Sequence, residues 1–204
     1  MNFFDIDGPF QRYGTVMFDL LMVNLLWIII ILLSLGILSG PANVALYTSV
    51  NQSIRNSYDS PMRTFFRTFK NKFKVSLIGG ILSMLIILTS IFSIFLIEAG
   101  HMPSWLTILY YVVIFYLILV APYFIALVSH TDFKLKKAVK YAVILTIKHF
   151  PTSFLIIMII GGLSILIVIS RYIAAFMAVA PTFLLISYLL SGRVLTQYDL
   201  KQFK

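Results

Sequence analysis

The sequence contains no cysteine and carries little charge. Without cysteine among its 204 residues, it can form no disulfide bond, no thiol nucleophile and no thiolate-bound zinc or iron–sulfur cluster. Only 11% of the residues are charged, whereas about a quarter are charged in soluble globular domains. With 60% hydrophobic residues and a mean hydropathy of +0.99, this composition excludes an ordinary water-soluble fold and indicates a helical membrane protein.

The motifs that mark catalytic or nucleotide-binding sites are also missing. The sequence has no Gly-x-Ser-x-Gly, Walker A or His-Glu-x-x-His string. Its three histidines, His101, His130 and His149, lie in connections at spacings that fit no metal-binding motif. We therefore expect no catalytic residue, no metal site and no cofactor, and a protein that is not an enzyme.

Long apolar runs occupy most of the chain. Five of them approach or exceed the roughly 20 residues that cross a bilayer, at about residues 16–35, 75–97, 105–129, 153–170 and 172–192. Gly40 and Pro41 predict a chain break after the first run. The helix expected after this break, residues 41–56, is more polar and only about 24 Å long. Whether this helix crosses the membrane decides between six and five spans.

Basic residues are concentrated in three segments. Of the 16 lysines and arginines, six lie in residues 51–74, five in residues 130–152 and three in the C-terminal tail. The positive-inside rule therefore places these segments, and the C-terminus, in the cytoplasm. The formal net charge of +9 is explained as a topology signal, so we expect no nucleic-acid partner.

A short internal repeat favours six spans. Gly40-Pro41, Ala121-Pro122 and Ala180-Pro181 each place a small residue and a proline ahead of a short apolar segment. Each fits the returning arm of a helical hairpin, with Pro122 and Pro181 kinking the spans that contain them. We expect an all-α polytopic bundle, residues 1–204 forming one integral membrane domain, with six helices in three hairpins and both termini cytoplasmic.

Residues 60–74 combine an aromatic stripe with a basic one. Ser60 is a typical N-cap and Pro61 a typical first helical residue. At helical spacing, Met62, Phe66, Phe69 and Phe73 share one face, and the adjacent face carries Arg63, Arg67, Lys70 and Lys74. This pattern predicts an interfacial helix whose cations contact anionic lipid headgroups. Residues 132–142 are similarly basic, and we expect them to lie along the membrane surface too.

Four polar residues near or within the spans are candidates for a functional or structural role. Asp19 is the only carboxylate near the interior of a span, which marks a functional candidate by default. Because Asp19 lies about one turn inside the span, it could instead reach headgroups or cap a neighbouring helix. Asn24 lies deeper and is expected to hydrogen-bond across a helix interface. Glu98 and Arg171 fall at outward helix ends, where they could pair or reach water separately.

Spacings of small residues predict close helix packing in two places. Ser76 and Gly80, and likewise Gly79 and Ser83, are separated by three residues. Such pairs let two helix backbones approach each other in a membrane.

The N-terminal third resembles a known family. The residues that carry the resemblance are Asp7-Gly8-Pro9, Asp19, Asn24 to Trp27, Gly40-Pro41-Ala42, Ala45 to Tyr47, Arg55, Phe65 to Lys70, and Phe73-Lys74. At this spacing, residues 3–75 are similar to the YesL-like family of uncharacterised bacterial integral membrane proteins. The resemblance implies a location in the bacterial cytoplasmic membrane and an accessory role in carbohydrate uptake or utilisation. It also implies membrane subunits of a sugar transporter as partners.

Two other functions remain open at this point. The chain could itself be a small-molecule transporter or channel, with substrate between the proline-kinked helices and with Asp19 or Asn24 as polar contacts. An intramembrane enzyme acting on lipid would need several polar groups at one depth, and the sequence shows no such cluster. A polar, water-accessible cavity would favour the transporter.

Overall fold

The computed structural model describes residues 9–54, 60–98, 103–170 and 175–194, and all of the elements in these ranges are helices. They are α1 (Pro9–Leu33), α2 (Ser39–Ile54), α3 (Pro61–Asn71), α4 (Phe73–Glu98), α5 (Ser104–His130), α6 (Leu135–Lys148), α7 (Phe150–Ile169), α8 (Ala175–Leu189) and the π-helical turn η1 (Leu190–Val194). The predicted all-α fold class is confirmed for this part of the chain.

Three of the described helices are long and apolar enough to cross a membrane. They cover Phe73–Ile97, Trp105–His130 and Phe150–Ile169, within α4, α5 and α7. Two shorter apolar segments, Met17–Leu33 and Ala178–Gly192, lie in α1 and at the end of the described chain. The length and composition of these helices suit a membrane location, and six crossings stay a prediction.

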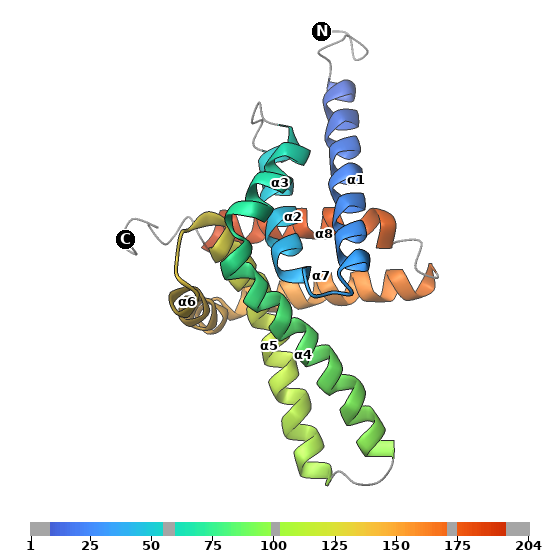
Figure 1. The fold of residues 1–204 in the computed structure, drawn as a ribbon, viewed down its shortest axis with the longest axis vertical. Coiled ribbons are helices and arrows are strands. Elements are labelled where there is room, and N and C mark those ends of the chain that lie inside the picture. Colours follow the sequence, from blue (N-terminus) through green and yellow to red (C-terminus); the bar gives the residue numbers. More distant parts are fainter. Residues whose placement is uncertain (1–8, 55–59, 99–102, 171–174, 195–204) are drawn as a thin grey trace.

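The two helices expected to form each hairpin are in contact with each other. Figure 1 shows α1 beside α2, α4 beside α5 and α7 beside α8, with the α4–α5 pair extending away from the other helices. The axes of the three pairs point in different directions, and α7 and α8 run crosswise to α1 (Figure 1). The predicted arrangement of six spanning helices in three hairpins is therefore not confirmed.

Helix α2 lies at the centre of the fold. It contacts α1, α3, α4, α5 and α8, and most of its side chains are buried, including those of Leu46 and Tyr47. A helix surrounded by other helices needs neither the length nor the hydrophobicity that lipid contact demands, because its polar groups find partners within the protein. This position explains why the segment is short and polar.

The break between α1 and α2 lies earlier than the sequence predicts. Leu35 and Gly36 have positive φ angles of 49° and 86°, and the Gly36 amide donates to the Ile31 carbonyl at 2.9 Å. This is the hydrogen bond of a Schellman motif, which ends a helix. The predicted break at Gly40 and Pro41 is wrong, because both lie in the first turn of α2, where the missing N–H of a proline costs no helical hydrogen bond.

Candidate functional site

Two asparagines of α2 join this central helix to its neighbours. The indole N–H of Trp27, in α1, donates to Oδ1 of Asn43 at 2.7 Å. Asn51 Nδ2 lies 3.2 Å from His130 Nε2, at the end of α5, and the ring of Tyr47 meets the His130 ring edge-on at 5.9 Å. Asn43 and Asn51 are not among the site residues predicted from the sequence, although the polar character of residues 42–55 is the signal that could have found them.

A second polar contact joins α5, α6 and α7. The hydroxyls of Tyr123 and Ser153 lie 2.8 Å apart, and Ser153 Oγ also donates to the Thr146 carbonyl at 3.0 Å. All three residues are buried. Because both hydroxyls are satisfied away from water, this contact holds the three helices together.

His149 lies at the junction between α6 and α7. Its backbone follows the last residue of α6 and precedes the first residue of α7. Burial lowers the pKa of His149 below its usual value of 6.5, and the neighbouring charge of Lys148 lowers it further. The imidazole is therefore neutral at pH 7.

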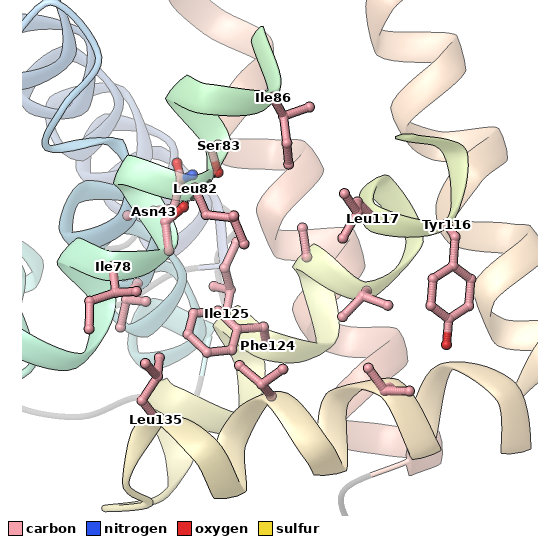
Figure 2. A pocket seen from close by; sticks show the side chains of 17 residues that line it. Asn43, Ile78, Leu82, Ser83, Ile86, Tyr116, Leu117, Phe124, Ile125 and Leu135 are labelled. Atoms are coloured by element: carbon pink, nitrogen blue, oxygen red, sulfur yellow. Dashed lines mark hydrogen bonds between the residues drawn. The ribbon is translucent and has the colours of Figure 1, made fainter. Parts of the chain in front are cut away.

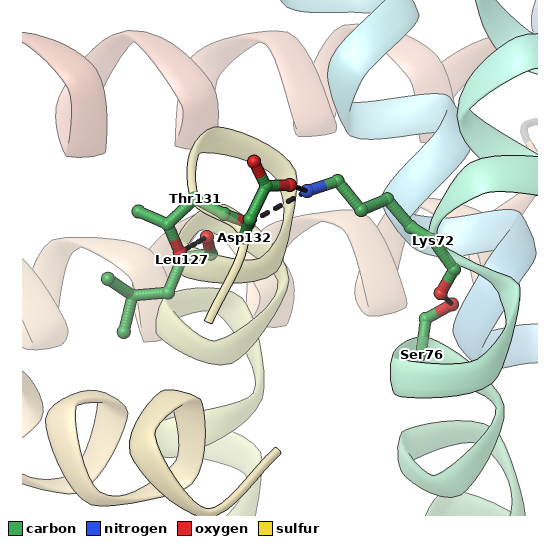
Figure 3. Close-up of polar contacts among 5 residues, drawn as sticks. All are labelled: Lys72, Ser76, Leu127, Thr131 and Asp132. Atoms are coloured by element: carbon green, nitrogen blue, oxygen red, sulfur yellow. Dashed lines mark hydrogen bonds and ion pairs between the residues drawn. The ribbon is translucent and has the colours of Figure 1, made fainter. Parts of the chain in front are cut away.

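Lys72 links the start of α4 to the connection between α5 and α6. Figure 3 shows its ammonium group beside Thr131 and Asp132. The ammonium donates to the Thr131 carbonyl at 2.8 Å and forms an ion pair with the exposed Asp132 carboxylate. The two basic segments of the sequence are thereby joined by one lysine.

Asp19 and Asn24 lie at different depths in the protein. Asn24 is completely buried, whereas Asp19 is half-buried. Because Asp19 and Asn24 are five positions apart on α1, they lie about 140° apart around the helix and do not share one face. Among the described residues, no hydrogen bond to the Asp19 carboxylate is seen.

The remaining predicted site residues are scattered. Pro122 is buried within α5, and Pro181 lies exposed within α8, so both are inside helices as expected. Glu98 is the last residue of α4. Arg171 lies outside the described residues, so both alternatives for Glu98 and Arg171, pairing or reaching water separately, stay open.

Helix α3 has three faces rather than two. The face that packs against the protein is formed by Pro61, Thr64, Phe65 and Thr68, which are buried. Met62 and Phe66 are exposed, as expected for a lipid-facing stripe. The predicted headgroup contacts Arg63, Arg67, Lys70 and Lys74 are exposed as well. Phe73 was expected in the same helix, but it begins α4.

A partly open cleft of about 380 Å³ lies between α2, α4, α5 and α6. Figure 2 shows Ile78, Leu82 and Ile86 of α4 facing Phe124 and Ile125 of α5, with α6 below them. Of the 17 residues that line the cleft, three have polar side chains, namely Asn43, Ser83 and Tyr116. The cleft therefore suits an apolar occupant.

The described polar contacts join helices to one another. The contacts of Asn43, Asn51 and Tyr123 each join two or three helices at separate places. Within the ranges that the structure describes, no three His, Cys, Asp or Glu side chains are close enough to hold a metal ion.

Comparison with known families finds a match over residues 20–94. This segment, from Leu20 of α1 to Ile94 of α4, matches the family described as "Protein of unknown function, DUF624". YesL-like proteins belong to this family, and the match overlaps much of the segment that resembles them. No curated protein and no solved structure matches the chain.

Proposed function

We propose that this chain is a non-enzymatic accessory component of a bacterial carbohydrate uptake or utilisation system. It resides in the cytoplasmic membrane as a multi-pass protein, with both termini in the cytoplasm. The apolar helices and the family match support the membrane location. The resemblance to YesL-like proteins supports the link to carbohydrate uptake.

The apolar lining of the cleft favours an accessory protein over a carrier. A carrier for a polar solute needs polar groups that line a path open to water and substrate. The cleft between α2, α4, α5 and α6 is lined mainly by apolar side chains. Trp27, Asn43 and Tyr123 form contacts between helices. These observations support an accessory role.

The exposed basic and apolar side chains indicate the partners that we propose. Arg63, Arg67, Lys70 and Lys74 are exposed beside Met62 and Phe66, which suits contact with anionic lipid headgroups. The exposed apolar faces of α4 and α5 suit lipid tails or the membrane subunits of a sugar transporter.

Deletion of the gene in its own host tests the proposal. Uptake of radiolabelled oligosaccharides is measured in the deletion strain and in the strain complemented with the wild-type chain. We expect uptake of at least one sugar to fall and to be restored by complementation. We also expect crosslinking in native membranes to connect the chain to a membrane subunit of that sugar's transporter. Unchanged uptake of every sugar tested would contradict the proposal.

The rival function is a small-molecule transporter or channel. The presence of Pro122 and Pro181 within α5 and α8 favours it, because a proline inside a helix removes a backbone hydrogen bond and distorted helices line many transport sites. A rival of this kind must move solute without any other subunit, which an accessory protein cannot do.

A further inference from the structure

We propose that the cleft between α4, α5 and α6 holds one acyl chain of an anionic phospholipid from the leaflet on the basic side of the membrane. The inference requires that α4 and α5 lie in the membrane, and it does not depend on a role in carbohydrate uptake. Its support comes from the depth, size and charge of the cleft.

The cleft lies at the depth of one lipid leaflet. Along α4 it extends from Ile78 to Ile86, which is about 8 to 20 Å from the start of the helix at Phe73. Along α5 it extends from Tyr116 to Ile125, about 8 to 21 Å from the end at His130. The hydrocarbon of one leaflet is about 15 Å thick. Both helices therefore place the cleft where the acyl chains of that leaflet lie.

Helix α6 supplies an apolar wall with lysines beside it. Leu135, Val139 and Val143 line the cleft and share one helix face at four-residue spacing. Lys136 and Lys140, each one position further along the chain, are exposed. A lipid whose tail lies against the apolar face would bring its phosphate close to these ammonium groups.

The size of the cleft suits a lipid tail. Its volume of about 380 Å³ falls within the range of small-molecule pockets, about 300 to 1,000 Å³. Leu82 and Val139 are partly exposed at the cleft, so a tail can enter from the membrane.

Photocrosslinking with matched variants tests this site. The full chain is placed in phosphatidylcholine vesicles that contain either phosphatidylglycerol or phosphatidylcholine with a diazirine in the middle of one acyl chain. After irradiation, peptide mass spectrometry locates the crosslinks. We expect them to concentrate on residues that line the cleft, with more from the anionic lipid than from the neutral one.

Two pairs of tryptophan variants separate specific binding from general lipid contact. Val139→Trp fills the cleft, and Ile144→Trp is its control on the same helix, because the two positions are 43% and 44% exposed and only Val139 lines the cleft. Leu82→Trp and Leu85→Trp, at 51% and 52% exposure, form the second pair on α4. In Val139→Trp and Leu82→Trp, the tryptophan should prevent the burial of a few methylene groups of the acyl chain. Crosslinking at the cleft should therefore be about tenfold lower than in the control of each pair.

Several results would overturn the proposal. One is equal crosslinking in both members of each pair, and another is uniform labelling of all the exposed apolar faces. Equal crosslinking by the neutral and the anionic lipid would overturn the assigned lipid class. A protein found crosslinked in the cleft in native membranes would overturn the lipid as its occupant. Thermal unfolding checks that each variant is folded, and the α4 pair decides the question if Val139→Trp does not fold.

Discussion

Gly40 of α2 lies directly against Gly80 of α4, so that the two backbones are in contact. A methyl group on Gly40 would overlap the Ser76 carbonyl oxygen and would lie 2.5 Å from the Gly80 amide nitrogen. A methyl group on Gly80 would lie 2.7 Å from the Gly40 nitrogen. The predicted small-residue pair Ser76 and Gly80 is therefore confirmed as a close helix contact, and Gly40 is its partner.

Gly40→Ala should destabilise the protein strongly. The added methyl group cannot fit unless α2 and α4 move apart, and overpacking of this kind costs about 3 kcal/mol. Gly161→Ala is the matched control, because a Cβ at this α7 position meets nothing within 4 Å and alanine favours a helix by up to about 1 kcal/mol. Thermal unfolding in detergent should show a lower midpoint for Gly40→Ala only. Equal midpoints for the two variants would show that α2 and α4 do not cross at this point.

Single cysteines should report the topology without interference, because the natural chain has none. In intact cells, an impermeant thiol reagent should label a cysteine at His101 and should not label one at Asn2 or Gln202. In lysed cells, all three should be labelled. Labelling at Asn2 in intact cells would reduce the count to five spans, because α2 would then not cross.

Asp19 and Asn24 should respond differently to substitution. Asp19→Asn keeps the size of a half-buried side chain that has no hydrogen bond among the described residues, so accumulation and sugar uptake should stay near wild-type levels. Asn24→Leu should lower accumulation in the membrane, because it changes the shape and polarity of a fully buried side chain at a helix interface. A stable Asp19→Asn protein with complete loss of uptake would instead assign Asp19 to a transport site.

The stability of the protein should fall on acidification because of His149. Its pKa is lowered in the folded state, chiefly by burial, so the unfolded chain binds more protons between that lowered pKa and the usual 6.5. Stability therefore rises with pH across this window and is lost as the pH falls below 6.5. Unfolding midpoints at pH 5 and pH 8 should differ less in His149→Gln than in the wild type. An identical pH dependence in both proteins would exclude this contribution.

The sequence predicts the helices well because the membrane imposes long apolar runs. Predicted spans 75–97, 105–129 and 153–170 agree with α4, α5 and α7 to within a few residues. The end of α1 was less predictable, because its αL position is occupied by Leu35 rather than by glycine, and leucine is not a usual signal for a helix end.

Packing partners were less predictable than the helices themselves. In α3, Phe65 is buried and the adjacent Phe66 is exposed, and only the position of α2 decides which of two neighbouring aromatic residues faces the protein. The contacts of Asn43 with Trp27 and of Lys72 with Thr131 join residues 16 and 59 positions apart. Nothing in the local sequence pattern identifies partners at such separations.

Reconstitution of the purified chain tests the accessory role most directly. The protein is inserted into liposomes, alone and together with the complete sugar transporter to which it crosslinks. Uptake of the radiolabelled sugar is then measured against protein-free liposomes. The account predicts no uptake above background by the chain alone, and faster uptake when it accompanies the transporter than when the transporter acts without it. Saturable sugar uptake by the chain alone would contradict the account and establish it as a carrier.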